Sequence, residues 1–319
     1  MQGTGKINGK QNEMTDECVR DKVIVVTGGG RGIGRGISLL LAEAGASVVV
    51  NDLGSSVSGE GASPGPADDV VAEIRAKGGQ AVSSHHSVSE WDSAQEIIAT
   101  AIDAFGRVDG VINNAGILRD RIFHKMSPDE FMAVLQVHLV GSFNVSRAAA
   151  EHFRNQGSGA FVHMTSSTGL IGNYGQANYG AAKLGLVGLS RCIALDMNRF
   201  GVRSNCISPA AFSRMTANLP SETEHQKALV EQTRNGLSPE KVAPLAVFLV
   251  SDLASNVTGQ IFSVRGNEIF LYNQTRPVRS VHQSQGWTPE SIAEHALPAF
   301  KSSLTPLEAI ADVFSWNPI

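Results

Sequence analysis

The chain has 319 residues, 42% of them hydrophobic and 18% charged, with a formal net charge of −4 and a pI near 6.1. This is the composition of a soluble globular protein, and because no basic run occurs we expect no nucleic-acid partner. No stretch reaches the roughly 18 apolar residues of a membrane span, so we expect no membrane partner. The three cysteines, Cys18, Cys192 and Cys206, lack metal-ligand spacing, which predicts reduced thiols, no metal site and a cytoplasmic location.

Composition divides the chain into three parts. Residues 1–20 are rich in Gly, Asn, Gln and Lys and lack apolar periodicity, so we expect a flexible leader outside the fold. Residues 21–265 alternate strand-like and helix-like patterns and form the predicted domain. Residues 266–319 contain several Pro and Trp residues without a regular pattern, which predicts an extension that caps the domain or contacts another subunit.

The first strand-like run, KVIVVT, is β-branched and nearly continuous, which is typical of a strand buried on both faces of a parallel sheet. GGGRGIGRG and then a helical pattern follow, and this order of strand, glycine turn and helix predicts a phosphate site. We expect Gly28 to allow the tight turn, and Gly32 and Gly34 to let backbone amides approach a pyrophosphate at the helix N-terminus. Arg31 and Ile33 belong to the same predicted nucleotide loop.

A carboxylate follows the second predicted strand, residues 47–51. Asp52 lies about twenty residues after the glycines, where a carboxylate can accept both hydroxyls of the adenine ribose and repels a 2′-phosphate. Arg31 favours the opposite cofactor, because it can meet that phosphate. We give priority to Asp52, since a like charge against the phosphate is hard to offset, and we predict NAD as the cofactor.

The alternation continues along the chain. Strands are predicted at 80–84, 107–112, 160–164, 202–207 and, as the last, 260–264, with helices over 91–105, 128–155, from about 177 to 200, and 239–253. Pro209 is expected to break the sixth strand. The connection rules then predict a single α/β domain with a Rossmann-type, doubly wound parallel sheet. After the fourth strand, the small side chains near Asn113, Ala115 and Gly116 should let the backbone pass beside a nucleotide.

Three residues suggest chemistry at an alcohol oxygen. Tyr179 and Lys183 are four residues apart on a predicted helix, so their side chains share a face. A nearby ammonium favours the phenolate and lowers the pKa of a tyrosine, which is ordinarily near 10. Ser166 follows a predicted strand and can hold a substrate oxygen beside the tyrosine. A chance tyrosine–lysine pair on a solvated helix is the alternative.

These motifs, taken in order, resemble those of the short-chain dehydrogenase/reductase family over the whole predicted domain: Thr27–Gly34, Asn113–Gly116, Ser166, and Tyr179 with Lys183. The resemblance implies an oxidoreductase with a nicotinamide cofactor. It assigns Tyr179 as catalytic base or acid and Ser166 as the group that orients the substrate oxygen. Lys183 would lower the pKa of Tyr179 and hold the nicotinamide ribose.

Within the family, VVVNDLG, GILRDRIF, VHLVGSF and GNYGQANYGAAKLGL resemble the (3R)-hydroxyacyl-CoA dehydrogenase part of the multifunctional β-oxidation enzyme and its stand-alone bacterial relatives. This implies NAD-dependent oxidation of a 3-hydroxyacyl-CoA, with a fatty or a steroid side chain. The alternatives are an NADPH-dependent 3-oxoacyl reductase, a hydroxysteroid dehydrogenase, and a nucleotide-binding sensor or scaffold without chemistry. Arg119 and Arg121 can meet CoA phosphates; surface arginines paired with Asp120 and Asp129 are the other interpretation.

The chain departs from the family pattern at two sites near the predicted active centre. His138 stands where most members have an asparagine that supports a water chain from the lysine, so we count it among the candidate catalytic residues; a buried core histidine is the alternative. Pro209-Ala210 replaces the usual Pro-Gly beside the nicotinamide. Similar proteins are oligomers, which predicts a homodimer or homotetramer through the helices around residues 130–155 and 178–198.

Overall fold

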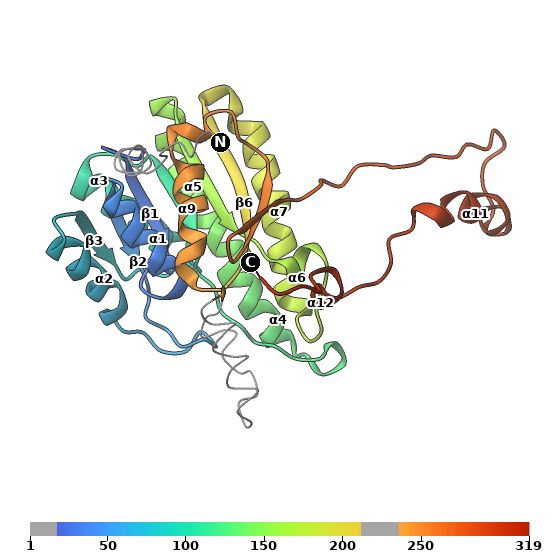
Figure 1. The fold of residues 1–319 in the computed structure, drawn as a ribbon, viewed down its shortest axis with the longest axis horizontal. Coiled ribbons are helices and arrows are strands. Elements are labelled where there is room, and N and C mark those ends of the chain that lie inside the picture. Colours follow the sequence, from blue (N-terminus) through green and yellow to red (C-terminus); the bar gives the residue numbers. More distant parts are fainter. Residues whose placement is uncertain (1–17, 212–235, 319) are drawn as a thin grey trace, which may run out of the picture.

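A computed structural model describes residues 18–211 and 236–318 of the chain (Figure 1). Within them one sheet has the strand order β3-β2-β1-β4-β5-β6-β7-β8, parallel throughout except for the antiparallel pair β7–β8. The strands are β1 (Val23–Thr27), β2 (Ser47–Asn51), β3 (Gln80–Ser84), β4 (Gly110–Asn113), β5 (Gly159–Met164), β6 (Val202–Ala210), β7 (Ile261–Arg265) and β8 (Glu268–Leu271). The order reverses between β1 and β4, so the predicted Rossmann-type doubly wound sheet is confirmed.

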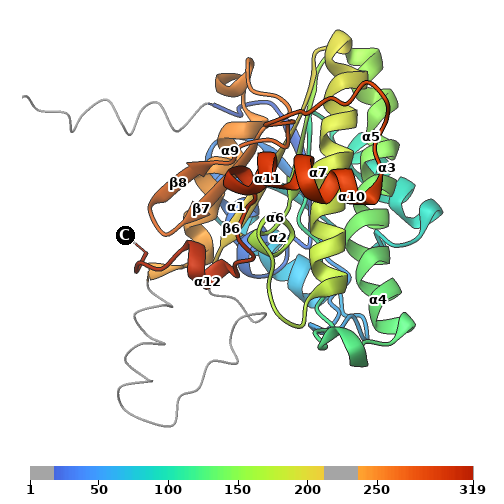
Figure 2. The same cartoon turned by 90° about the vertical axis from the view of Figure 1, so that its right-hand side faces the viewer.

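Helices cover both faces of the sheet. The α-helices of the described ranges are α1 (Gly32–Glu43), α2 (Gly65–Ala76), α3 (Trp91–Phe105), α4 (Pro128–Leu135), α5 (Gly141–Gln156), α6 (Ser167–Leu170), α7 (Ala177–Met197), α9 (Ala243–Val250), α10 (Pro289–Ser291), α11 (Leu297–Phe300) and α12 (Ile310–Val313). α1, α2 and α9 pack on one face, and α3, α5 and α7 on the other (Figure 2). None of the helices in the described ranges is long and apolar enough to cross a membrane.

Alternate residues of each central strand supply the two cores. In β1, Ile24 and Val26 face the layer of α1, whereas Val23 and Val25 face the layer of α3 and α5. This alternation explains the continuous β-branched run, because both faces of the strand are buried. Val19 is also fully buried in the first core, so the fold begins before the predicted boundary at residue 21; residues 1–17 of the predicted leader lie outside the described residues.

The predicted long helix over 128–155 is interrupted. A π-helical turn, Gln136–Val140, separates α4 from α5, and His138 lies inside it. Shorter 3₁₀ turns are Phe123–Lys125, Asn198–Phe200, Pro239–Val242, Asp252–Ala254 and Lys301–Ser303, and a second π turn is Ile292–Ala296. A π turn inserts one residue into the helical ladder and re-aims the side chains around it.

Two predictions near the end of the sheet are wrong. Strand β6 does not stop before Pro209: it runs to Ala210, because β5 has already ended opposite Ile207 and Pro209 has a neighbouring strand only on the β7 side. Nor is β7 the last strand, since β8 pairs with it through a tight turn in which Gly266 has a φ of +63°. The sheet therefore extends past the predicted boundary at residue 265.

After β8 the chain leaves the body of the protein. The segment with α10 and α11 projects away from the sheet, and the chain then returns so that α12 lies near α6 (Figure 1). The predicted capping or oligomer-contact role of residues 266–319 stays a prediction.

Candidate active site

The turn between β1 and α1 forms one end of a long cleft. Gly28 and Gly32 have φ angles of +63° and +51°, which other residues rarely adopt. A Cβ at Gly28 would lie 2.9 Å from the Cα of Ala115, whereas nothing lies within 4 Å of a Cβ built at Gly32. Because α1 begins at Gly32, unpaired backbone N–H groups face this open space, which fits the pyrophosphate of a dinucleotide.

Gly34 has a packing role rather than a place in the cleft lining. A Cβ on Gly34 would lie only 2.0 Å from the carbonyl oxygen of Gly28, so only glycine lets α1 approach the turn this closely. This close contact holds the helix N-terminus against the end of β1.

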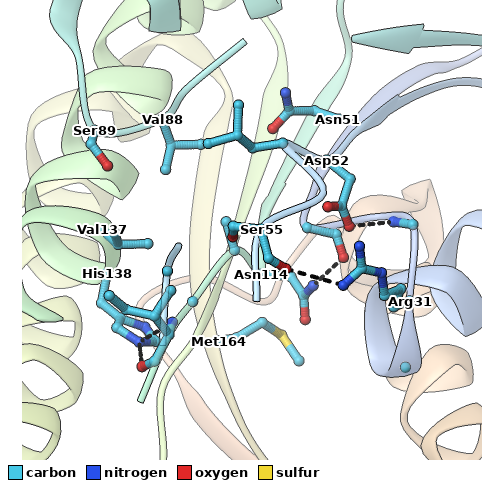
Figure 3. Close-up of a pocket in the computed structure, with 18 of the residues that line it drawn as sticks. Arg31, Asn51, Asp52, Ser55, Val88, Ser89, Asn114, Val137, His138 and Met164 are labelled. Carbon is cyan, nitrogen blue, oxygen red and sulfur yellow. Dashed lines mark hydrogen bonds between the residues drawn. The ribbon is translucent and has the colours of Figure 1, made fainter. Parts of the chain in front are cut away.

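Asp52 and Arg31 lie side by side at the ribose end of the cleft (Figure 3). The two carboxylate oxygens of Asp52 accept hydrogen bonds from the amides of Gly30, at 3.0 Å, and Gly54, at 2.7 Å. The guanidinium of Arg31 donates to the carbonyl oxygens of Gly54 and Ser55, both at 3.1 Å. Asp52 therefore orders the glycine turn, and Arg31 is held by the neighbouring loop.

The end of β4 differs from the prediction at Asn113. Its side chain is buried behind the sheet, with Nδ2 2.9 Å from Ser146 Oγ and 3.2 Å from His163 Nδ1, and it does not line the cleft. The next residue, Asn114, does line it, and its Nδ2 donates to the carbonyl oxygens of Thr27 and Gly28 at 3.1 and 3.0 Å. We had not predicted Asn114, although its place in the motif is a signal for it.

The predicted catalytic residues meet at the other end of the cleft. Ser166 is the N-cap of α6 and its Oγ accepts from the amide of Thr168 at 3.1 Å; its hydroxyl also acts to lower the pKa of Tyr179. Tyr179 lies in the first turn of α7, and Lys183 follows one turn later. Lys183 Nζ lies 5.4 Å from the centroid of the Tyr179 ring and donates to the carbonyl oxygen of Met164 at 2.5 Å.

Burial shifts the pKa of Tyr179 upward, whereas a nearby ammonium was expected to lower it. It raises the pKa of Tyr179 to about 12, although the hydrogen bond from Ser166 acts in the opposite direction. Burial also lowers the pKa of Lys183 to about 7, so in the protein alone its side chain is only partly protonated near neutral pH. In the protein by itself desolvation dominates, because it disfavours both charged forms, and the lowering of the pKa of Tyr179 by Lys183 stays a prediction.

His138 is buried beside these residues. Its Nε2 lies 2.8 Å from the carbonyl oxygen and 3.1 Å from the amide nitrogen of Ile117, while Nδ1 has no hydrogen-bond partner among the described residues. Burial, followed by the nearby charge of Lys183, lowers the pKa of His138 well below its usual value, so the imidazole is neutral. A Cβ on Gly116 would lie 2.2 Å from His138 Cε1, so Gly116 makes room for the ring.

The cleft has a volume of about 640 Å³ and connects the two ends. Ten of the predicted residues line it: Gly28, Arg31, Gly32, Ile33, Asp52, Ala115, Gly116, His138, Tyr179 and Lys183. Gly34, Asn113 and Ser166 do not, although Thr165, next to Ser166, does. Its shape and lining suit an extended dinucleotide with a reacting group beside Tyr179.

Neither arginine suggested for CoA lines the cleft. Arg121 pairs with Glu130, with Nη2 3.0 Å from Oε1, rather than with either aspartate named from the sequence. Arg119 donates from Nε to the carbonyl oxygen of Ser58 at 3.1 Å. Both are used within the protein.

A dinucleotide cleft that ends at Tyr179 and the buried Lys183, with Ser166 directly next to its lining in the chain, defines a class of nicotinamide-dependent oxidoreductases. The family model described as "Enoyl-(Acyl carrier protein) reductase" matches residues 28–266. A solved structure, a short chain dehydrogenase from Mycobacterium avium, superposes with a TM-score of 0.79 at 37% identity over 92% of this chain and 99% of that one. The chain belongs to the short-chain dehydrogenase/reductase family.

Two relatives bear on the finer resemblance. A hydroxyacyl-CoA dehydrogenase, ChsB1, of Mycobacterium tuberculosis is 38% identical over 85% of this chain and 86% of that protein. The peroxisomal multifunctional enzyme type 2 of Mus musculus is 42% identical over 86% of this chain, which spans only 36% of the length of that enzyme. The predicted resemblance to both kinds of protein is confirmed.

Proposed function

We propose that this oxidoreductase converts a 3-hydroxyacyl-CoA to the ketone with NAD. The observation that carries the proposal is a single cleft with Asp52 at one end and Tyr179 and Lys183 at the other. A carboxylate at the ribose end suits a cofactor without a 2′-phosphate. The phenol at the far end suits proton transfer at an alcohol or ketone oxygen.

Each active-site residue has a distinct task in this mechanism. The Ser166 hydroxyl holds the substrate oxygen, and Tyr179 exchanges the proton with it. NAD, when bound, supplies the hydride acceptor. Lys183 lies against the Tyr179 ring and, in its protonated form, provides positive charge; His138 is a positioning residue beside the tyrosine. As burial keeps Tyr179 protonated in the protein alone, oxidation requires that the loaded site stabilise the phenolate.

The same observation supports a second candidate. A neutral phenol is ready to donate a proton to a ketone oxygen, so the site also suits reduction of a 3-oxoacyl group. Asp52 disfavours NADPH for that reaction, since its carboxylate would face the 2′-phosphate. A hydroxysteroid remains the alternative alcohol, and a sensor or scaffold is the alternative without chemistry.

The proposal includes a homodimer or homotetramer in the cytoplasm. Met132 in α4, Phe143 in α5, and Leu184 and Leu195 in α7 are exposed apolar side chains on the helices expected to form the contact. The projecting segment with α10 offers a further surface (Figure 1). Light scattering should give the mass of a dimer or tetramer, and Leu195→Glu should weaken assembly; a monomer at all concentrations contradicts this part.

The cysteines of the described residues are free thiols, which suits the cytoplasm.

The test is NADH formation with (3R)- and (3S)-hydroxyacyl-CoAs of several chain lengths, compared with NADP⁺ and with Tyr179→Phe. We expect turnover of the (R) ester with NAD⁺ and a loss of about a hundredfold or more in the variant. The variant should still bind NADH, which is followed by nucleotide fluorescence. Failure of every thioester, with NADH still bound, would contradict the CoA assignment and favour free steroids; unchanged turnover in Tyr179→Phe would contradict the catalytic assignment.

A further inference from the structure

A second cavity, of about 390 Å³, is lined in part by residues that directly follow residues of the cleft lining in the chain. Thr165, which precedes Ser166, lines the cleft, and Ser167, which follows it, lines the second cavity. Pro209 and Ala210 are divided between the two in the same way. Ser166 therefore stands in the chain between a residue of the cleft lining and a residue of the second cavity's lining.

The chain's own C-terminal segment forms one wall of this cavity. Ile310, Ala311 and Phe314, in or just after α12, line it together with Leu237, and they make this wall apolar. Figures 1 and 2 both place α12 at the end of the sheet where β6 and β7 finish. Residues more than a hundred positions apart in the sequence thus enclose a space beside the reacting centre.

An aromatic and ionic cluster fastens this segment to the last two strands. The Phe314 ring lies 5.4 Å from Phe270 and 5.6 Å from Trp316, measured between centroids. Arg265 lies 5.8 Å from the centroid of Phe314 and also donates to the carbonyl oxygen of Trp316. Trp316 Nε1 donates to Glu268 Oε1 at 2.9 Å. The Phe314 ring thus contacts two aromatic rings and one guanidinium group, and these contacts fix its position in the cavity wall.

The polar side chains that line the cavity already have partners. Ser167 Oγ lies 3.1 Å from Ser208 Oγ, and Ser263 Oγ donates to the Ser208 carbonyl oxygen at 2.7 Å. Asn173 Nδ2 donates to Gln176 at 3.0 Å, and Arg265 Nη1 lies 3.2 Å from Glu268 Oε2. The cavity walls therefore offer a ligand mainly apolar contact. A hydrocarbon group can fill the cavity without leaving polar groups unpaired.

We infer that this cavity is the subsite for the hydrocarbon chain of the acyl group, and that Phe314 and Ile310 set its affinity for long chains. The inference rests on the proposed function, which it extends from reaction type to acyl recognition. A straight chain is favoured over a steroid, because the volume is near the lower end of the range for small-ligand pockets.

The test compares Phe314→Ala with Val313→Ala. Val313, the last residue of α12, directly precedes Phe314 but does not line the cavity. For Phe314→Ala we expect KM for (3R)-hydroxydodecanoyl-CoA to rise about tenfold, as for other losses of apolar contact, and KM for (3R)-hydroxybutyryl-CoA to change by less than about twofold. Val313→Ala should match the unaltered protein. Ile310→Ala, which lines the cavity without joining the aromatic cluster, should show the same dependence on chain length if the wall itself matters.

A binding measurement separates failure of this inference from failure of the proposed function. Calorimetry with dodecanoyl-CoA, which has no hydroxyl to oxidise, reports the subsite without turnover. If no hydroxyacyl-CoA is oxidised but dodecanoyl-CoA binds and Phe314→Ala weakens it, the subsite stands and the reaction is wrong. Equal losses for long and short chains, equal effects of the two variants, or preferential binding of a steroid thioester would overturn the acyl-chain subsite.

Discussion

The imidazole of His138 stands edge-on to the ring of Tyr179, with the two centroids 5.2 Å apart and an angle of 88° between the planes. The π turn, Gln136–Val140, provides this placement, and Gly116 leaves space for the ring. Since Nδ1 of His138 is buried without a partner among the described residues, the side chain carries an unsatisfied polar group beside the catalytic centre. Such a group is costly unless a water or ligand completes it, and the catalytic role predicted for His138 stays a prediction beside the alternative of a buried core histidine.

Replacement of His138 should separate hydrogen bonding from packing. We expect His138→Leu to lower kcat roughly tenfold to a hundredfold, because it removes the polar group behind Tyr179, whereas His138→Asn should retain much of the activity. The measurement is kcat against pH for both variants, since a purely structural role would lower kcat without moving the profile. Wild-type kcat in His138→Leu would remove His138 from the mechanism.

Asp52 should control the choice of cofactor. In Asp52→Asn the charge that would face a 2′-phosphate is lost, and the amide oxygen can still accept from one of the amides of Gly30 and Gly54, while the NH₂ group faces the other. We expect kcat/KM with NADP⁺ to rise about tenfold relative to NAD⁺, equivalent to about 1.4 kcal/mol. Asp68→Asn is the matched control, because it removes the same charge from α2 without altering the cleft lining. If the ratio of kcat/KM with NADP⁺ to that with NAD⁺ changed equally in both variants, the carboxylate of Asp52 would not set the preference for NAD⁺.

The strands and glycine turn could be predicted from the sequence because local patterns specify them. β2 and β3 have the predicted bounds, and so does α3. The burial of the Asn113 side chain was predictable too, because Asn113 lies two residues after Val111 in the same strand and so points to the same face of the sheet, which packs on the helices. Asn114 lines the cleft instead. β8 was also signalled, since Gly266-Asn267 between two apolar runs is a hairpin pattern.

Other features depend on tertiary structure. The π turn at His138 keeps nearly the periodicity of a helix, so the sequence around it reads as uninterrupted. The spacing of Tyr179 and Lys183 predicts proximity but not the burial that raises one pKa and lowers the other. Likewise, no local pattern shows that Phe314 lies beside Ser167 across the sheet end, because that contact depends on the path of the chain after β8.

The buried Lys183 should make stability depend on pH. Its pKa falls from 10.5 to about 7 on burial, so between these values the unfolded chain binds more protons than the folded protein. The free energy of unfolding should then rise with pH across this window, by at most about 1.4 kcal/mol per pH unit from this group, and lose that contribution as pH falls to about 7. Lys183→Met removes the dependence, so without nucleotide the variant should gain stability relative to wild type as pH is lowered from about 10 to 7. Urea unfolding across this range measures the difference, and parallel curves would contradict the assignment.

Among the glycines of the nucleotide turn, Gly34 leaves the least space for a Cβ atom, so it should be the hardest of them to replace. In Gly34→Ala the new Cβ would meet the Gly28 carbonyl oxygen at 2.0 Å, and because both are backbone positions neither can rotate away. We expect a loss of about 3 kcal/mol or more in the free energy of unfolding, together with weaker NADH binding as α1 is pushed from the turn. Gly36→Ala, in the same helix, brings a Cβ only to 3.3 Å from the Glu240 Cα and also gains helix propensity, so its net effect should lie within about 1 kcal/mol. Urea unfolding and NADH titration of both variants make the comparison; similar stabilities would show that the turn yields to the added methyl group.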